Sequence, residues 1–268
     1  MLKLAGALIL IYAAAVAFLA IFQRSFIYHP PRIALDQRAL RAAEYEALDQ
    51  PVRGPATLWF AGPRAPESWT IVFLHGNSGD IAGAIGKVSP LRAAGYGVLL
   101  VEYPGFSQVA GRPTQLSIVA QATMALRALE ARGVGGDRVV LWGESLGTGV
   151  AIQLAADHQI GGLILEAAFT AVADRAQEIY WWMPARRLVL DRFDSLARIR
   201  DINAPILLVH GEQDRVTPPD HGRRLLAAAN EPKRGVFFPS GGHVDLVDHG
   251  LMSEILRFLA ESPARPAR

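Results

Sequence analysis

The sequence predicts an α/β fold built on one mainly parallel β-sheet. Short apolar runs alternate with longer helix-compatible segments along the chain, and this alternation is typical of βαβ units. Several runs are apolar at nearly every position, as expected of strands covered by helices on both faces. A chain of 268 residues, 51% of them hydrophobic, can bury one large core, and α/β chains of this length commonly form a single domain.

The expected elements follow this alternation in order. After a first strand near residues 44–47, strands are expected near Leu58, Val72, Leu99, Val140, Ile164, Leu208 and Phe237. Helices are expected at residues 81–94, 115–132, 145–157, 220–229 and 246–259. In the second helix the residues expected to face the core are Leu116, Val119, Ala120, Met124 and Ala128, which form one apolar stripe at helical spacing.

A serine between glycines occupies the junction of a strand and a helix. The string Gly143-Glu144-Ser145-Leu146-Gly147 follows an apolar run and precedes a helix-compatible run. A serine becomes a useful nucleophile when a sharp turn holds its hydroxyl clear of the backbone, beside a base and near amide donors. The crowded backbone of such a turn favours residues without a Cβ on both sides. Ser145 is therefore the expected nucleophile.

The acid and the base are expected in later loops. Asp214 lies just beyond the apolar run 206–209, and His243 ends the loop beyond the run 235–238. Open α/β sheets place their sites at the carboxyl ends of strands. His243 is the expected general base, and Asp214 is the acid expected to orient it.

Other residues compete for these two roles. The alternative acids are Glu212, Asp220 and Asp245, which are interpreted as solvated or helix-capping charges. His249 is the main alternative base, but it falls where the last helix is expected.

Three further histidines are assigned structural or solvated roles. His158 and His221 lie in or beside expected helices and are predicted to be surface residues. His210 ends a strand in front of a glycine, where a packed, hydrogen-bonded role is expected.

The loop after the strand at residues 70–74 supplies the remaining part of a site. It begins His75-Gly76-Asn77 and is placed to aim a backbone amide at a developing oxyanion. The amides of Asn77 and Leu146 are the oxyanion-hole candidates. His75 is expected to orient the loop.

Five ordered motifs resemble those of the α/β-hydrolase superfamily. They are His75-Gly76-Asn77, Val101-Glu102-Tyr103-Pro104-Gly105, Gly143-Glu144-Ser145-Leu146-Gly147, His210-Gly211-x-x-Asp214 and Gly241-Gly242-His243. The resemblance covers about residues 56–260. It implies an α/β-hydrolase fold, with helices on both faces of the sheet, and a serine hydrolase whose triad is Ser145, Asp214 and His243.

Two segments resemble one branch of that superfamily. Residues 24–30, after an apolar N-terminus, and residues 191–195 are similar to the small membrane-anchored branch. That branch includes bacterial proteins of unknown substrate and eukaryotic membrane-associated hydrolases, some of them protein depalmitoylases. One departure is the segment 104–107, Pro-Gly-Phe-Ser, where the relatives usually carry Arg-Gly-Tyr-Gly.

Several classes of function are not supported by the sequence. The chain has no cysteine, so thiolate chemistry and disulfides are excluded. It carries no zinc-binding spacing, P-loop or dinucleotide fingerprint, and no cofactor or metal is expected. A net charge of +2 with scattered arginines gives no indication of nucleic-acid binding.

The N-terminal segment predicts membrane association. Residues 4–22 carry no charge, a length sufficient to cross ~30 Å of hydrocarbon. Residues 1–23 are interpreted as a single-pass membrane anchor, an uncleaved signal anchor. The alternative is a signal peptide cleaved near residues 15–17 and an exported protein. Positive charge after the segment slightly favours a cytoplasmic catalytic domain.

The predicted organisation continues from this anchor. Residues 24–55 are expected to form an extended tether and the first strand, and residues 56–262 the catalytic domain. Residues 167–202 exceed the length of a crossover helix and are expected to form a small helical cap, whose most apolar part is 180–184. These aromatic residues are assigned to a core, an acyl pocket or contact with a bilayer. Residues 263–268 form a tail.

Together these observations predict a serine hydrolase of the esterase or thioesterase type, acting on a small-molecule or lipid-derived acyl substrate. A peptidase is the enzymatic alternative, because the same triad cleaves amides. A non-catalytic, membrane-anchored binding or scaffold protein is the alternative from another class.

Overall fold

The computed structural model describes residues 2–49 and 54–262; the predicted tail, residues 263–268, lies outside them. An eight-stranded sheet in the order β1-β2-β4-β3-β5-β6-β7-β8 forms the centre. The strands are β1 (Glu46–Ala47), β2 (Leu58–Ala61), β3 (Thr70–Leu74), β4 (Gly97–Val101), β5 (Val139–Glu144), β6 (Gly162–Glu166), β7 (Ile206–Gly211) and β8 (Lys233–Phe238). The strands from β3 to β8 run parallel, whereas the β1–β2 and β2–β4 pairs are antiparallel. The predicted mainly parallel α/β fold is confirmed.

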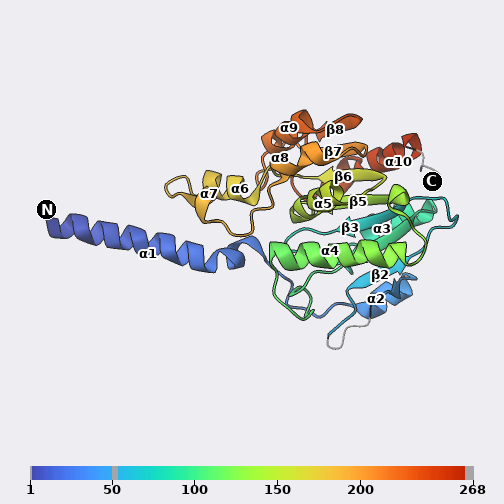
Figure 1. Cartoon of the computed structure of the whole chain (residues 1–268), viewed down its shortest axis with the longest axis horizontal. Coiled ribbons are helices and arrows are strands. Elements are labelled where there is room, and N and C mark those ends of the chain that lie inside the picture. Colours follow the sequence, from blue (N-terminus) through green and yellow to red (C-terminus); the bar gives the residue numbers. More distant parts are fainter. Residues whose placement is uncertain (1, 50–53, 263–268) are drawn as a thin grey trace.

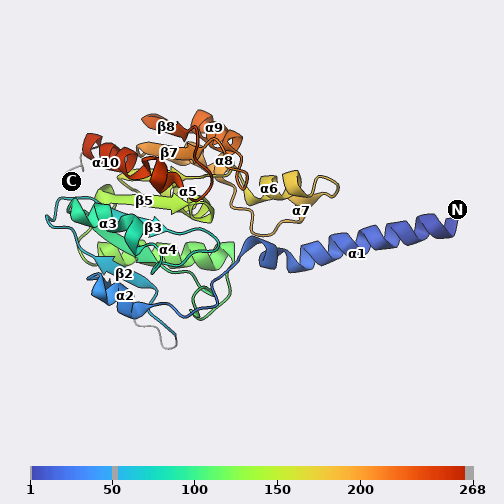
Figure 2. The ribbon, with the colours of Figure 1, turned by 180° about the vertical axis from the view of Figure 1, so that it is seen from behind.

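Helices cover both faces of this sheet (Figure 1). The helices of the described residues are α1 (Leu2–Ile27), α2 (Gln37–Ala42), α3 (Ile85–Ala93), α4 (Gln115–Glu130), α5 (Leu146–Asp157), α6 (Val172–Ile179), α7 (Ala185–Leu188), α8 (Ser195–Arg198), α9 (Pro219–Ala228) and α10 (Leu251–Glu261), with the short 3-10 turns η1 (Gly136–Arg138), η2 (Ile199–Asp201) and η3 (Leu246–His249). Seen from behind, α3 and α10 lie in front of the strands (Figure 2).

The strands bury alternate residues in two separate cores. Val72 and Leu74 of β3 pack in a cluster with α4 and α5, whereas Ile71 and Phe73 pack in a second cluster with α3 and α10. Successive side chains of a strand point to opposite faces of the sheet. The continuous apolar runs in the sequence therefore reflect two buried faces.

The core-facing stripe predicted for α4 is wrong in part: Val119 and Ala128 pack against the core, but Leu116, Ala120 and Met124 are exposed. The buried residues of this helix are Ile118, Ala122, Ala125 and Leu129, whereas Leu116 and Met124 are 82% and 51% exposed. Both sets fit helical spacing, and the buried set packs in the same core cluster as residues of α5.

The N-terminal helix projects from the body of the molecule along its longest axis (Figure 1). It continues through Ile27, so residues 24–27 are helical and not part of an extended tether. Tyr28, the next residue, is 3% exposed and packs in the core. The helices α6 and α7 lie beside the part of α1 that is nearest the sheet (Figures 1 and 2).

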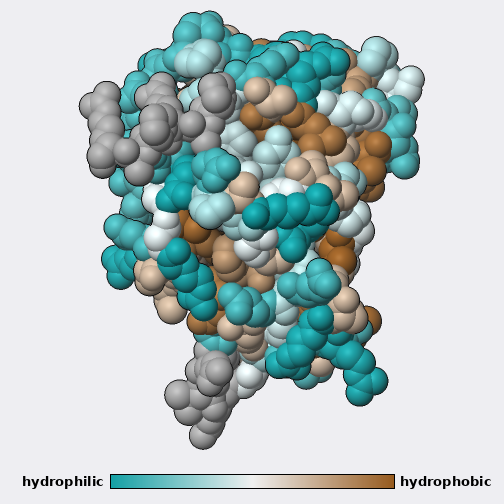
Figure 3. Space-filling model, turned by 90° about the vertical axis from the view of Figure 1, so that its right-hand side faces the viewer, coloured by the Kyte–Doolittle hydropathy of each residue, from teal (hydrophilic) through white to brown (hydrophobic). Residues whose placement is uncertain are grey.

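The surface at the opposite end of the molecule is mixed in polarity. Hydrophilic side chains make up much of that end, with smaller apolar areas between them (Figure 3). The long, exposed apolar surface belongs to α1, which is long and apolar enough to cross a membrane.

Candidate active site

The backbone at Ser145 is held in a strained turn between β5 and α5. Its φ and ψ are 49° and −114°, a region that costs a residue with a Cβ of the order of 1–3 kcal/mol. A Cβ at Gly147 would lie 1.9 Å from the carbonyl oxygen of Leu74, and one at Gly143 would lie 2.4 Å from that of Gly147. The two glycines therefore permit the turn that lifts the Ser145 hydroxyl away from the sheet.

The structure brings the predicted nucleophile, base and acid into one hydrogen-bonded chain. His243 Nε2 lies 2.9 Å from Ser145 Oγ, and His243 Nδ1 lies 2.7 Å from Asp214 Oδ2. These contacts join residues from the loops after β5, β7 and β8, which are far apart in the sequence. The ring is therefore placed to donate from Nδ1 to the carboxylate and to accept the serine proton at Nε2.

Asp214 is held as an ionised carboxylate. Its side chain is fully buried, and its Oδ1 accepts hydrogen bonds from the amides of Val216 and Thr217 at 2.9 and 2.8 Å. Burial acts to raise the pKa of Asp214, but hydrogen bonds from His210, His243 and the Thr217 amide outweigh it and hold this pKa well below its ordinary value. A stable negative charge thus faces the ring of His243.

The competing acids lie elsewhere. Glu212 forms an ion pair with Arg223 at 2.5 Å, and Asp220 is exposed on α9. Asp245 accepts the amide of Gly242 at 2.6 Å. This last contact fixes the loop that carries His243, a positioning role that is visible only in the folded chain.

The competing histidines are also separated from the serine. His249 is in η3, and its Nε2 lies 3.7 Å from Asp245. His158 is exposed, as predicted. His210 is buried and donates to the carbonyl of Thr217 at 2.8 Å, in agreement with the packed role assigned to it.

The surface position predicted for His221 is wrong. This side chain is 2% exposed, and its Nδ1 accepts a hydrogen bond from the backbone amide of Thr170 at 3.2 Å. Its Nε2 lies 3.1 Å from Glu178. His221 therefore joins α9 to α6 and to the segment that precedes α6.

The loop after β3 approaches the nucleophile turn. A Cβ at Gly76 would lie 3.5 Å from Ser145 Cβ, so the backbone that leads to Asn77 passes beside the serine. His75 is buried, contacts Glu102 Oε1 through Nε2 at 2.9 Å, and contacts the carbonyl of Gly76 through Nδ1 at 2.8 Å. Burial acts to lower the pKa of His75, but the charge of Glu102 outweighs it and raises this pKa. The loop is therefore held by an ion pair beneath it.

A second ionic cluster behind the turn was not predicted. Lys87 of α3 contacts the carboxylates of both Glu144 and Glu166, and Trp142 Nε1 donates to Glu166 at 3.1 Å. Burial raises the pKa of Glu166 to about 7, although Lys87 opposes that shift. The available signal was a carboxylate at the end of each of two neighbouring strands, but no sequence pattern places Lys87 between them.

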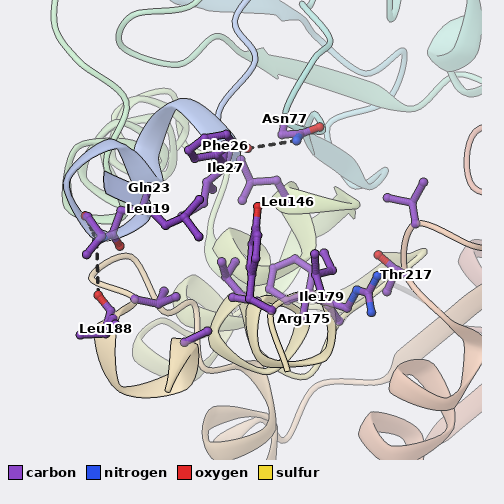
Figure 4. Close-up of a pocket in the computed structure, with 18 of the residues that line it drawn as sticks. Leu19, Gln23, Phe26, Ile27, Asn77, Leu146, Arg175, Ile179, Leu188 and Thr217 are labelled. Carbon is purple, nitrogen blue, oxygen red and sulfur yellow. Dashed lines mark hydrogen bonds between the residues drawn. The ribbon is translucent and has the colours of Figure 1, made fainter. Parts of the chain in front are cut away.

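An apolar pocket opens beside Ser145. Its volume is about 230 Å³. The lining comes from α1, α6, α7 and the loops after β3, β5 and β7, and includes Leu19, Gln23, Phe26, Asn77, Ser145, Leu146, Arg175, Ile179, Met183, Leu188 and Thr217. Figure 4 shows Leu19, Gln23 and Leu188 on the side of the pocket away from Thr217, with Leu146 between them. Within residues 2–49 and 54–262, no group of three acidic or histidine side chains is arranged to hold a metal ion.

The sequence of this chain matches one family profile and is similar to several known proteins. The profile of the Alpha/beta hydrolase family matches residues 71–193. An uncharacterized protein from Mycobacterium tuberculosis is 34% identical over 266 residues, which cover 94% of this chain and 92% of the relative. The human Alpha/beta hydrolase domain-containing protein 17B is 26% identical over 194 residues, 70% of this chain and 65% of that protein.

A solved structure has the same fold. The esterase Pf2001 from Pyrococcus furiosus superposes with a TM-score of 0.68 over 87% of this chain and 99% of its own, at 16% sequence identity. At this identity the likeness extends to the fold alone.

Proposed function

The chain belongs to the alpha/beta hydrolase superfamily, and on that premise we propose that it is a serine hydrolase that cleaves carboxylic ester or thioester bonds through an acyl-enzyme intermediate. The observation that carries the proposal is the chain of two hydrogen bonds, 2.9 and 2.7 Å long, from Ser145 through His243 to Asp214. A packed core has no need for a buried acid, a ring and a strained serine in this arrangement.

In the proposed mechanism, Ser145 Oγ attacks the acyl carbonyl carbon while His243 Nε2 takes the hydroxyl proton. Asp214 holds the ring and stabilises its positive charge. The tetrahedral intermediate collapses when its bond to the alcohol or thiol breaks, and His243 returns the proton to that leaving group. Water then attacks the acyl-enzyme with the same base, which releases the acid and restores Ser145.

The amides of Asn77 and Leu146 are the proposed donors to the oxyanion. The Leu146 amide opens α5, where the first turn of a helix leaves its N–H groups without helical partners. Asn77 is in the loop that passes beside Ser145. Each such donor is typically worth ~2.7–4 kcal/mol of barrier lowering.

The surroundings of Ser145 support an acyl substrate that is small or derived from lipid. The pocket walls are mainly aliphatic and aromatic, and Arg175 is the one charged residue among those described that line it. We propose that α1 anchors the chain in a membrane as a single pass through residues 4–22, since this helix is long and apolar enough to cross one.

Ester turnover by the full chain in detergent micelles tests the function. Wild-type protein is expected to hydrolyse p-nitrophenyl butyrate and a butyryl thioester, and Ser145→Ala is expected to lose at least ~10⁴-fold in kcat. Ser89→Ala, at an exposed serine of α3, is the matched control and should retain the wild-type rate. Equal activity of wild type and Ser145→Ala would contradict the proposal, and cleavage of peptide amides alone would favour the peptidase.

A further inference from the structure

We propose that the second half of α1 is a wall of the acyl-binding pocket and sets the length of acyl chain that the enzyme accepts. This role goes beyond membrane anchoring. It rests on the proposed function, because it assigns a contact surface to the acyl group that Ser145 would carry.

The first observation is the composition of the pocket wall. Five residues of α1 line the same cavity as Ser145, namely Leu19, Ala20, Gln23, Phe26 and Ile27. They recur at the spacing of one helix face, whereas Ile21 between them is 73% exposed and does not line the cavity. Across the cavity lie Ile179 of α6, Leu188 of α7 and Met183 from the segment between these helices. The cavity therefore lies between the anchor and the cap, with Ser145 at its inner side.

The second observation is that α1 is fixed to the cap by directional bonds. Gln23 donates from Nε2 to the carbonyl of Leu188 at 3.2 Å and accepts the amide of Leu190 at 2.7 Å. The next residue, Arg24, pairs with the buried carboxylate of Asp191 at 2.8 Å. Because the side-chain amide of Gln23 both donates and accepts a hydrogen bond, it fixes the rotation of α1 about its own axis. Leu19 and Phe26 therefore face the cavity.

The end of α1 is also joined to the loop beside the serine. Asn77 Nδ2 donates to the carbonyl of Ile27 at 3.0 Å, and the amide of His29 donates to the carbonyl of Asn77 at 3.0 Å. The wall therefore begins at the proposed oxyanion loop and extends away from it along α1 (Figure 4).

The chemistry of this wall suits an extended apolar chain. Apart from Gln23, its residues are aliphatic or aromatic. Farther along α1, Tyr12 packs edge-on against Trp182 of the cap with ring centroids 5.9 Å apart. Ile179, Trp181 and Leu190 of the cap are 56%, 80% and 66% exposed beside this helix. An acyl chain held in a membrane can enter between these apolar side chains and α1 without crossing water.

The position of Leu19 makes the proposal testable. Leu19 lines the pocket on the side away from Thr217 (Figure 4). If the distal part of a long acyl chain occupies this end of the cavity, a tryptophan there should fill its space and an alanine should extend it. Each methylene added to or removed from apolar contact changes binding by roughly fourfold. The two substitutions at Leu19 therefore act in opposite directions.

The experiment measures kcat/KM of the full chain for a series of p-nitrophenyl esters from acetyl to palmitoyl, in mixed micelles. Leu19→Trp is expected to lower the ratio of palmitoyl to butyryl turnover by at least about tenfold. Leu19→Ala is expected to move the optimum toward longer chains. Leu10→Trp and Leu10→Ala are the matched controls, because Leu10 is 71% exposed on the same helix and does not line the pocket; they should keep the wild-type ratio.

The outcomes separate this inference from the function on which it rests. If wild type turns over the esters but the Leu19 and Leu10 variants share its chain-length profile, α1 is only an anchor and the inference is overturned. If wild type turns over none of them, the proposed function fails first. Should Leu19→Trp not fold, the shift expected for Leu19→Ala alone decides the question.

Discussion

At the scale of single residues, the site depends on a few groups held in unfavourable states. Ser145 has a positive φ of 49°, and Asp214 keeps its charge while its side chain is excluded from solvent. Local conformational and desolvation costs of this kind persist only where the surrounding contacts enforce them. Here the enforcing contacts are the hydrogen bonds to the Asp214 carboxylate and the two glycines beside the serine.

Asp214→Asn tests the role of the acid. An amide in this position cannot stabilise a charged His243 and favours the wrong ring tautomer, so kcat should fall by ~10⁴-fold. Because the pKa of Asp214 is held far below its ordinary value, the fall should be the same at every pH where wild type is active. Asp220→Asn, at an exposed carboxylate on α9, should leave kcat unchanged. A loss confined to low pH would contradict the assigned role.

Glu166 gives a pH-dependent prediction about stability. Its pKa is raised by burial from an ordinary value of 4.5 to about 7, so the folded chain keeps a proton that the unfolded chain releases. The stabilising effect of this proton is complete below pH 4.5 and is lost as the pH rises to about 7. Protonation also leaves Lys87 balanced by Glu144 alone, which makes the cluster neutral.

The comparison with Glu166→Gln isolates this effect, because glutamine cannot ionise. The difference in unfolding free energy, wild type minus variant, should fall by on the order of 1 kcal/mol per pH unit across that interval and level off above it. Thermal unfolding in detergent at a series of pH values measures this difference. A constant or rising difference would show that Glu166 is ionised in the folded chain throughout.

The sequence predicted the residues of the candidate site, but it did not predict the polar contacts that hold the surrounding segments in place. Ser145, Asp214 and His243 each follow an apolar strand, and the ends of parallel strands meet at one edge of a sheet, which is why their proximity could be predicted. The contacts of His221 with Thr170 and of Lys87 with Glu144 and Glu166 depend on the packing of helices that no local pattern specifies. The polar groups that hold the site together were therefore found only in the structure.

At the scale of elements, the fold depends on close approach between β3 and α5. A Cβ at Gly147 would meet the Leu74 carbonyl at 1.9 Å, and neither backbone can move without displacing the nucleophile turn. Gly147→Ala is therefore expected to destabilise the protein by more than about 4 kcal/mol.

Gly86→Ala is the matched control, because a Cβ at that position in α3 meets no atom within 4 Å. It is expected to stabilise the protein by about 0.4–1 kcal/mol through the entropy of the unfolded chain. Thermal unfolding of the two variants beside wild type measures both effects. Equal stabilities of the two variants would contradict the proposed close packing.

Element type could be predicted from the sequence, but element boundaries and buried faces could not. The helix expected at residues 81–94 begins only at Ile85, because the Asp80 carboxylate accepts the amide of Gly83 at 2.7 Å and forms a turn first. The helix expected at residues 246–259 is interrupted at Gly250, which has a φ of 99°. These local side-chain bonds and left-handed residues compete with helix formation at the ends of each segment.

At the scale of the whole molecule, the main difference from expectation is the relation between α1 and the rest of the chain. The sequence predicted an apolar helix followed by an extended tether. In the structure the helix continues to Ile27, and its Gln23 hydrogen-bonds to the backbone of Leu188 and Leu190. Pairing of Arg24 with Asp191 joins residues that are far apart in the chain, so no local pattern could have predicted it.

This arrangement makes α1 part of the candidate site. Both Ser145 and α1 border the same cavity. The orientation of the domain at a bilayer is therefore expected to direct the cavity toward the apolar phase, where long acyl groups are found.

The central claim is that His243 and Asp214 activate Ser145 as a nucleophile. The most direct test treats the full chain with a fluorophosphonate probe and maps the covalent adduct by mass spectrometry, with Ser145→Ala and His243→Ala in parallel. The account predicts an adduct on Ser145 of wild type, none at this position in Ser145→Ala, and strongly reduced labelling in His243→Ala. Absence of an adduct on folded wild-type protein, or equal labelling in His243→Ala, would contradict it.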